Sequence, residues 1–338
     1  MAFVVFKRGA LSVGAVGTDE QVRDAATLLS PYASAEPATL VDTHPTIYAD
    51  GRAVPDQTVF QHVAFTTDNE PTTEYRFSCE RRCIIIDEPR DPAWLIQHIA
   101  RLVRVLLRLQ LAEQGAMFVH AGMVAIRGQG FAIVGQKRSG KTSSILAALR
   151  LPGCSYVTND DLALVESGGN WVGMGWPRGV SVRSDSRLAL AELGGPLLDP
   201  SRLSHPANRD LVFAPTESSA LIAYPAELAD AFGTSVSPTS EVSAVIFPEF
   251  QPIGTMGGSL TRVSDEEAGS RLSDSLRTDP NKYEAFLLPM FKMVPRTLLE
   301  LKLRQLVTRI PCFLLRQSMS DLGRGTALME ELMAKEFA

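Results

Sequence analysis

Cysteines, an excess of basic residues and long apolar runs are all missing or scarce in this sequence of 338 residues. Its four cysteines, Cys79, Cys83, Cys154 and Cys312, are too few and too scattered for a disulfide framework or a four-ligand zinc site. The net charge of -5 argues against general nucleic-acid binding, which needs a dense basic surface. No run of about 18 apolar residues is available to span a bilayer. We therefore expect reduced thiols, a cytoplasmic location, and neither nucleic acid nor membrane as a partner.

The composition is that of an ordinary globular protein, with 45% hydrophobic and 21% charged residues. A chain of this length exceeds the usual size of one domain, so two units are expected. Residues 1–90 contain short Val/Ile/Phe/Tyr runs separated by turn residues, which predicts a β-rich N-terminal domain. Helical spacing begins at Asp91 and continues to Leu109. We expect residues 91–338, with this leading helix, to form the second domain.

Strands and helices interleave through the second domain, which predicts an α/β layer structure. Ser, Pro and Ala are frequent in residues 184–240, and this segment is expected to include a loop that gates a substrate. Strands are predicted at 116–120, 123–126, 131–134, 155–158, 242–247 and 310–315, a hairpin at 162–173, and helices at 142–149, 265–276 and 325–337.

A complete phosphate-binding loop motif follows the apolar strand at 131–134 and opens a helix. Its residues are Gly135, Gln136, Lys137, Arg138, Ser139, Gly140, Lys141 and Thr142, and Ser143 completes the nucleotide-binding set. In such a loop the backbone N–H groups surround phosphate oxygens, Lys141 adds a positive charge at the β- and γ-phosphates, and Thr142 offers a hydroxyl to Mg²⁺. Lys137 and Arg138 are expected to face solvent unless one of them touches phosphate.

An acidic pair, Asp160 and Asp161, closes the next predicted strand. A parallel sheet would bring this pair beside the carboxyl end of the strand that leads into the loop. One carboxylate could then hold Mg²⁺ while the other takes a hydroxyl proton, a division that suits phosphoryl transfer. The alternative is an exposed turn or a helix cap, but the nearby phosphate-binding loop favours the functional interpretation.

Three further side chains are candidates with open alternatives. His120 ends a predicted strand, where a lone histidine among apolar residues is usually a satisfied core or turn residue. Arg178 and Arg183 follow the predicted hairpin, and either could grip an anionic phosphate or substrate. Two ordinary surface arginines explain the same pattern equally well.

The ordered set of His120-Ala-Gly, the turn at 127–130, the loop at 135–142 and Asn159-Asp160-Asp161 resembles the catalytic domain of HPr kinase/phosphorylase. It looks closer still to HPr-kinase-like proteins of peptide-modification gene clusters, including lasso-peptide kinases. The resemblance covers about residues 95–335 and is best over 116–165. The sequence departs from the family in lacking a further central glycine in the loop and a recognisable downstream acidic segment, so reverse phosphorylase activity is not expected.

This resemblance implies a phosphoenolpyruvate-carboxykinase-like P-loop fold and an ATP- and Mg²⁺-dependent kinase acting on a hydroxyl of a peptide, a protein or a small natural-product precursor. It implies Asp160 as the base, Asp161 as a metal ligand and His120 near the phosphates. Lys141 and Arg178 complete the expected catalytic set, and Thr142 the expected metal set. An ATP-binding regulatory or assembly module without phosphotransfer is the alternative, and a homo-oligomer stays open.

Overall fold

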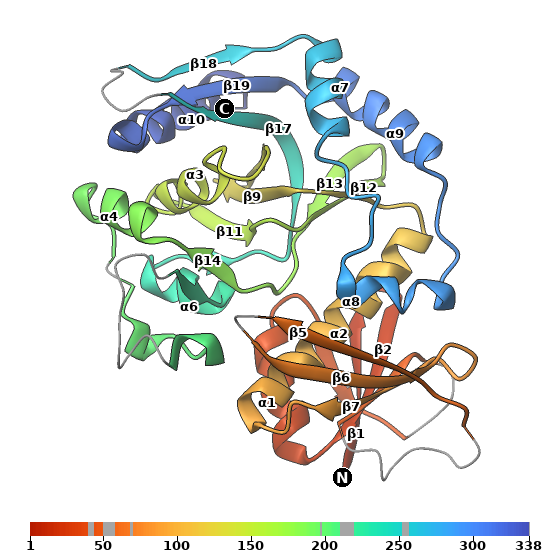
Figure 1. Cartoon of the computed structure of the whole chain (residues 1–338). Helices are drawn as coiled ribbons and strands as arrows, with labels where there is room; N and C mark the ends of the chain where they lie inside the picture. Colours follow the sequence, from red (N-terminus) through yellow and green to blue (C-terminus); the bar gives the residue numbers. More distant parts are fainter. Residues whose placement is uncertain are drawn as a thin grey trace. The chain divides into compact units, whose positions relative to one another are not determined.

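The computed structural model describes residues 1–39, 44–49, 58–67, 70–196, 198–209, 220–251 and 257–337. The chain forms two compact units (Figure 1). Residues 1–115 and 279–294 make up one, called here the N-terminal unit, and residues 116–278 and 295–338 make up the other, the P-loop unit. All four cysteines are free thiols. No helix in the described ranges has both the length and the apolar character needed to cross a membrane.

A seven-stranded sheet in the order β3-β1-β2-β4-β7-β6-β5 forms the N-terminal unit. Strands β1 and β2 pair antiparallel, whereas β2, β4 and β7 run parallel to one another. The strands are β1 (Ala2–Arg8), β2 (Leu11–Gly17), β3 (Ser34–Pro37), β4 (Thr46–Tyr48), β5 (Gln61–Thr67), β6 (Glu70–Ser78) and β7 (Cys83–Glu88).

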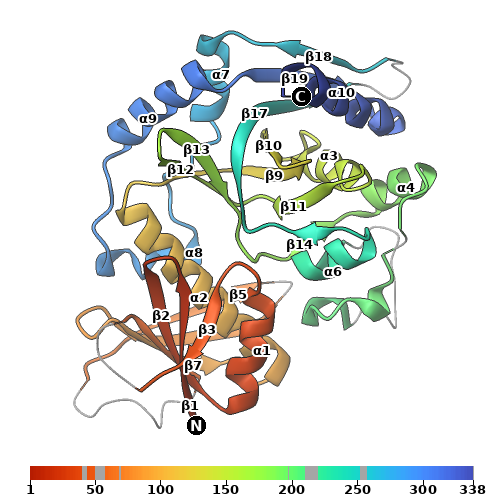
Figure 2. The same ribbon diagram turned by 180° about the vertical axis from the view of Figure 1, so that it is seen from behind.

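Helices α1 (Asp19–Leu29) and α2 (Pro92–Glu113) pack against each other and against this sheet (Figure 2). A capping box starts α1, because the Thr18 hydroxyl accepts from the Gln21 N–H and the Gln21 side chain accepts from the Thr18 N–H. The Asp91 carboxylate caps α2, and Pro92 fits its first turn. The short helix α8 (Lys282–Ala285) and the 3₁₀ turn η4 (Leu288–Met290) also belong to this unit.

The boundary between the units lies at Gly115 instead of residue 90. Helix α2 was expected to lead the second domain, but it packs with α1 and β2 in the N-terminal unit. Its residues are buried around most of the helix circumference, which fits a helix enclosed by one unit. The return of residues 279–294 to the N-terminal unit was not predicted, because a helical pattern such as the one from Lys282 onward does not show which unit the segment packs in.

The sheet of the P-loop unit has the order β16-β11-β9-β10-β17-β13-β12-β8, and β19 extends it from β17 to β18. A separate hairpin pairs β14 (Val180–Val182) with β15 (Leu221–Ala223). The other strands are β8 (Met117–Val119), β9 (Ala121–Ile126), β10 (Gln129–Val134), β11 (Cys154–Thr158), β12 (Leu162–Ser167), β13 (Asn170–Met174), β16 (Ser235–Val236), β17 (Thr239–Phe250), β18 (Ser259–Arg262) and β19 (Cys312–Gln317).

Two hydrophobic cores, one on each face of this sheet, follow from the alternation of side chains along the strands. Phe131 and Ile133 of β10 join the core beneath α3, α4 and α10, whereas Ala132 and Val134 join the core beneath α7 and α9. The helices are α3 (Lys141–Ala148), α4 (Ser184–Glu192), α6 (Pro225–Ala231), α7 (Asp265–Ser273), α9 (Arg296–Arg309) and α10 (Leu322–Glu336), with 3₁₀ turns η2 (Pro200–Arg202), η3 (Pro206–Asn208) and η5 (Met319–Asp321).

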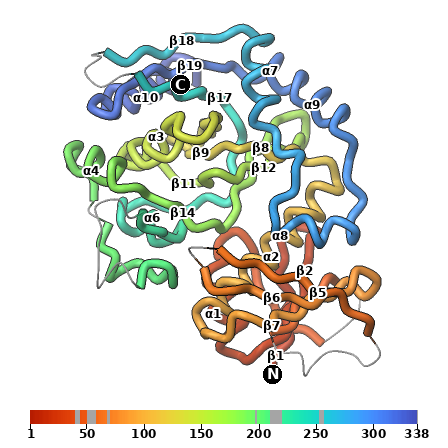
Figure 3. Tube along the Cα trace, in the orientation of Figure 1, coloured from red at the N-terminus to blue at the C-terminus, as the bar shows by residue number. Residues whose placement is uncertain are grey.

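The predicted strands and helices of residues 116–174, and the mixed α/β class, are confirmed (Figure 3). One pairing is different: β11 does not lie beside β10, because β9 pairs antiparallel with both of them. As both run antiparallel to β9, β10 and β11 are parallel to each other, so their carboxyl ends still meet at one edge of the sheet. The predicted gating loop stays a prediction, and residues 210–219 within it lie outside the described residues.

Candidate functional site

The loop between β10 and α3 has the backbone geometry of an anion site. Gly140 is the N-cap of α3 with φ 99°, a left-handed conformation that favours glycine, and it provides no side-chain cap. A Cβ at Gly140 would lie 2.7 Å from ring atoms of Phe250, so a side chain there would also require the ring to move. The first N–H groups of α3 are therefore presented together with the positive end of the helix dipole to a bound anion.

Arg138 holds a strained position at the tip of this loop. Its φ of 71° lies in the left-handed region, which costs a non-glycine residue about 1 kcal/mol or more. The loop thus keeps its curvature although its sequence lacks a further central glycine. Backbone strain of this kind is concentrated at ligand-binding sites, where the surrounding structure maintains it.

Lys141 is held inside the loop, with 5% of its side chain exposed. Its Nζ donates to the carbonyl oxygens of Gly135 at 2.7 Å and Gln136 at 3.0 Å. Burial lowers the pKa of Lys141, and the carboxylate of Asp160, 3.8 Å from Nζ, opposes that shift. The ammonium group is thus fixed at the N-terminus of α3, where it can reach a phosphate.

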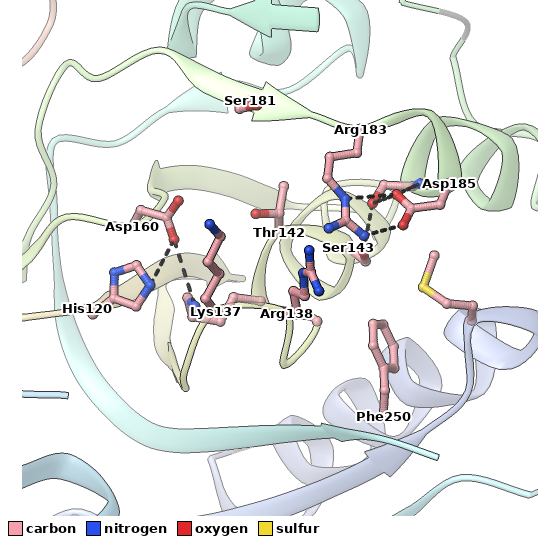
Figure 4. Close-up of a pocket in the computed structure, with 14 residues that line it drawn as sticks. His120, Lys137, Arg138, Thr142, Ser143, Asp160, Ser181, Arg183, Asp185 and Phe250 are labelled. Carbon is pink, nitrogen blue, oxygen red and sulfur yellow. Dashed lines mark hydrogen bonds and ion pairs between the residues drawn. The ribbon is translucent and has the colours of Figure 1, made fainter. Parts of the chain in front are cut away.

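Asp160 and His120 lie together at this point, next to Lys141 (Figure 4). His120 Nε2 lies 3.8 Å from Asp160 Oδ1. Arg277 Nη2 donates to the carbonyl oxygen of Asp160 at 2.7 Å and lies 2.8 Å from His120 Nδ1. Asp160 itself has φ 60°, a second strained residue at the site, so its carboxylate is aimed by a backbone conformation that Asp tolerates better than most residues.

His120 is a neutral imidazole at neutral pH. Its pKa is lowered by burial first and then by the positive charge of Lys141, while Asp160 pulls in the opposite direction. A guanidinium can only donate, so the contact with Arg277 makes Nδ1 the acceptor and leaves the proton on Nε2. The Nε2–H group therefore lies on the side of the Asp160 carboxylate.

Hydroxyl groups of the first turn of α3 extend the polar site along the helix. Thr142 Oγ1 donates to Asn159 Oδ1 at 3.2 Å, which ties the loop to the end of β11. Ser143 Oγ lies 3.0 Å from Ser186 Oγ and so connects α3 to α4.

A cavity of about 470 Å³ opens over these groups, a size typical of small-molecule sites. His120, Lys141 and Asp160 lie at one end of it, and Arg183, Asp185 and Phe250 lie at the other (Figure 4). The residues that line it are His120, Lys137, Arg138, Gly140, Lys141, Thr142, Ser143, Asp160, Ser181, Arg183, Asp185, Ser186, Phe250 and Met319.

Most of the residues singled out from the sequence meet in this cavity, but five do not line it. Asp161 is buried, with 2% exposure, and its carbonyl oxygen accepts from Thr158 Oγ1. Arg178 is half-buried, and its charge reaches His120 from outside the lining. Gly135, Gln136 and Ser139 line a second cavity of about 410 Å³ on the other side of the loop, together with Lys137 and Arg138.

Sequence reasoning missed Arg277 and the Asn159 amide as functional residues. Arg277 lies 157 residues from His120 along the chain. It reaches the site because the preceding residue, Leu276, forms a β-bridge with Val119, the residue before His120. No local spacing predicts such a contact. Asn159 directly precedes the acidic pair, so its position was a signal that could have been used.

The side chains present fit a nucleotide with magnesium. The Thr142 hydroxyl, the Asn159 amide oxygen and the Asp160 carboxylate are hard oxygen donors grouped near the end of α3. No group of three or more His, Cys, Asp or Glu side chains suited to a metal occurs among the residues that the structure describes. Magnesium in phosphoryl-transfer sites is commonly held by one or two protein ligands plus phosphates and waters, which matches this sparse donor set.

No protein-family model matches this chain, and a comparison with curated proteins also gave no match. Among solved structures the chain is similar to the HPr(Ser) kinase/phosphatase from Coxiella burnetii, with 14% identity over 65% of this chain and 99% of the other. The TM-score of that match is 0.30. At this score the likeness supports no conclusion about the fold or the activity, so the function has to be inferred from the site itself.

Proposed function

We propose that this chain is an ATP- and Mg²⁺-dependent kinase of the phosphoenolpyruvate-carboxykinase-like P-loop type that transfers the γ-phosphate to an alcohol group. The observation that carries the proposal is the meeting of Lys141 and Asp160, whose Nζ and Oδ1 atoms lie 3.8 Å apart at the N-terminus of α3. A cation that binds phosphate and a carboxylate that can take a proton then face the same point in one cavity.

In this proposal the loop backbone and Lys141 bind the β- and γ-phosphates. The Thr142 hydroxyl, which lines the cavity, would hold Mg²⁺ together with phosphate oxygens and waters. Magnesium supplies positive charge that neutralises the phosphate oxygens. A direct ligand role for Asp161 stays a prediction, since this carboxylate is buried and does not line the cavity.

The chemical step moves one proton and one phosphoryl group. The acceptor oxygen forms a bond to the γ-phosphorus, its proton passes to the Asp160 carboxylate, and the bond to the β,γ-bridging oxygen breaks with its electrons kept by ADP. His120 stays neutral and offers its Nε2–H to an oxygen beside Asp160. Arg277 holds both residues in place and so acts as a positioning residue.

The acceptor class follows from the same proposal as a hydroxyl of a peptide, a protein or a small natural-product precursor. We further propose that the N-terminal unit recruits this acceptor. Strand β5 ends its seven-stranded sheet, and several of its side chains are exposed, which gives an extended segment a place to pair.

The test is transfer of label from γ-labelled ATP, with Mg²⁺, into a panel of hydroxyl-bearing peptides and small molecules. Wild type, Lys141→Ala and Asp160→Asn are compared, and ATP binding is measured for each. Label in an acceptor with wild type and its loss in both variants supports the kinase.

ATP binding without any labelled product, retained by Asp160→Asn, would contradict the kinase and favour the regulatory or assembly module. The lack of ATP binding by wild type would remove both, because both use the loop at 135–142 as a nucleotide site.

A further inference from the structure

We infer that the end of the cavity away from Asp160 is the nucleoside subsite: the base packs on Phe250 and Met319 beneath Arg138, and the ribose hydroxyls face Asp185. This inference rests on the proposed function, since it needs the phosphates of a nucleotide to lie at Lys141. The phosphate-binding loop alone does not specify where the base and the ribose of the nucleotide lie.

The direction of the nucleotide follows from the polarity of the cavity. Lys141 and Asp160 fix the γ-phosphate end, and Thr142 and Ser143 continue along the first turn of α3. Ser143 Oγ is 3.0 Å from Ser186 Oγ, so the polar path continues from α3 to the start of α4. A nucleotide whose phosphates follow this path enters the region of Phe250 and Asp185, which Figure 4 shows opposite Asp160.

Two apolar side chains, Phe250 and Met319, line the cavity, and the turn η5 that Met319 begins contacts α4, the helix that carries Asp185. Phe250 is the last residue of β17, and Met319 begins the 3₁₀ turn after β19. Both are partly buried against the core beneath α3 and α10, while their remaining surface lines the cavity. An aromatic ring and a polarisable thioether suit the flat face of a nucleobase, and an arginine such as Arg138 can stack on its other side.

The Phe250 ring lies against the backbone of the loop at Gly140. Its edge lies so near Gly140 that a Cβ there would come within 2.7 Å of it. The ring therefore adjoins the residue at which the phosphate site begins. A base stacked on it would be joined to phosphates at the helix N-terminus through the ribose, without leaving the cavity.

Asp185 supplies acceptors for ribose hydroxyl groups. Its Oδ1 atom accepts from Arg183 Nε at 3.3 Å and from the N–H and the hydroxyl of Ser186 at 2.7 and 3.3 Å, whereas Oδ2, among the described residues, accepts from Arg183 Nη2 alone. The hydrogen bond from Arg183 lowers the pKa of Asp185, so the carboxylate is ionised at neutral pH. A carboxylate oxygen can accept about two hydrogen bonds, so the place that remains for a ribose hydroxyl is at Oδ2. Acidic side chains bind ribose hydroxyls in other nucleotide sites.

The second cavity fits the nucleoside less well. Arg138 and Phe250 line it as well, together with Gln136, Ser139 and Asp274. Lys141, Thr142 and Ser143, however, line only the first cavity. Phosphates bound at the N-terminus of α3 lie in the first cavity, and a nucleoside in the second would have to pass around the loop tip at 137–138.

The experiment compares the affinities of Mg-ATP and Mg-tripolyphosphate by titration calorimetry. The variants are Phe250→Ala, Phe250→Tyr, which keeps an aromatic ring, and Lys141→Ala. A matched control is Phe232→Ala, because Phe232 packs against the same core but does not line the cavity. We expect Phe250→Ala to weaken ATP binding about tenfold or more and tripolyphosphate binding less than about twofold.

We expect Phe250→Tyr and Phe232→Ala to bind both ligands with nearly wild-type affinity, and Lys141→Ala to bind both ligands weakly. Equal weakening of ATP and tripolyphosphate by Phe250→Ala, or no weakening of either, overturns the nucleoside subsite while the phosphate site stands. Wild type that binds tripolyphosphate as tightly as ATP also overturns it. Wild type that binds neither ligand removes the proposed function and this inference together.

Discussion

Each unit of this chain contains a histidine with a lowered pKa beside an arginine and a carboxylate, and the two sites differ in access. In the N-terminal unit, His98 is fully buried and hydrogen-bonds through Nδ1 with the Tyr75 hydroxyl. Burial, followed by the charge of Arg101, lowers its pKa to about 3. In the P-loop unit, His120 keeps 29% of its side chain exposed and lines a cavity.

The partners of the two histidines differ in the same way. Arg101 donates to both carboxylate oxygens of Glu70, at 2.7 and 3.0 Å, and the Tyr283 hydroxyl donates to Glu70 at 2.9 Å. Both carboxylate oxygens of Glu70 thus have hydrogen-bond donors, in the bidentate arrangement typical of arginine–carboxylate pairs. The Asp160 carboxylate instead stands 3.8 Å from both Lys141 and His120, on a strained backbone.

A perturbed pKa therefore does not identify a functional site in this protein. Desolvation lowers the pKa of a histidine in a sealed core as readily as in a cleft. The P-loop site is distinguished by a cavity, by loose charge contacts and by strained residues at 138 and 160. If this difference is correct, substitutions in the Glu70–Arg101 network should change the stability of the protein, and substitutions at Asp160 should change the rate of phosphate transfer.

The largest effect is expected from Asp160→Asn in the P-loop unit. Removal of the proton acceptor should lower the rate of phosphate transfer about 10³-fold, while the Kd for Mg-ATP changes less than about threefold. Transfer kinetics at saturating ATP measure this. Asp230→Asn, at an exposed position of helix α6, is the matched control and should leave the rate unchanged. Transfer by Asp160→Asn at the wild-type rate would show that Asp160 is not the base.

Next in size is the loss of stability from Arg101→Met in the N-terminal unit. This change leaves the Glu70 carboxylate without its buried partner and should lower the free energy of unfolding by about 3 kcal/mol. Urea denaturation measures the loss, and the rate of transfer per folded molecule should not change.

The double variant Arg101→Met with Glu70→Gln should recover much of that stability, because no uncompensated charge remains. A fall in transfer rate that exceeds the fall in folded protein would place this network in the chemistry and break the comparison.

A pH dependence of stability should come from His98. Its pKa is about 3 in the folded state and about 6.5 when unfolded, so the unfolded state binds the extra proton between these values. The contribution of His98 to stability is present above about pH 6.5 and is lost as the pH falls toward 3. Between about pH 7 and pH 5 the loss should be about 2 kcal/mol.

Urea denaturation of wild type and His98→Gln at the two pH values isolates this contribution. The variant should show a smaller fall in stability than wild type, by about the amount given above. Identical pH dependence in the two proteins would mean that His98 titrates normally in the folded state.

The smallest effect is expected from Arg138→Gly at the tip of the loop. Glycine removes the left-handed strain, but it also raises the entropy of the unfolded chain, so the net gain in stability should be about 0.5 kcal/mol. Lys137→Gly is the matched control, since Lys137 is not among the residues with positive φ, and it should destabilise the protein. A loss of stability with Arg138→Gly would show that the arginine side chain outweighs the strain.

The order of elements around the loop could be predicted because local patterns determine it. Apolar runs, glycines and the loop motif predict β9, β10, α3 and β11, and these place His120, Lys141 and Asp160 at one edge. Pairing partners were harder to predict. The sequence indicates that β11 is a strand, but an antiparallel β9 between β10 and β11 depends on contacts far apart in the chain.

Other parts escaped prediction for different physical reasons. Helix α1 has a capping box at Thr18 and Gln21, a local signal that the β-rich interpretation of residues 1–90 passed over. Helix α2 shows helical spacing, but spacing alone does not reveal which unit encloses a helix. Arg277 reaches the site only through tertiary structure.

The most direct test of the proposed kinase activity is phosphorus NMR of wild type with Mg-ATP and a candidate acceptor, with ATP binding measured in the same sample. If the protein is a kinase acting on a hydroxyl group, the ATP signals should decline while those of ADP and of a phosphomonoester of the acceptor grow in equal amounts. ATP that is bound at saturation but unchanged across the acceptor panel, or converted only to ADP and inorganic phosphate, would contradict a kinase acting on a hydroxyl group.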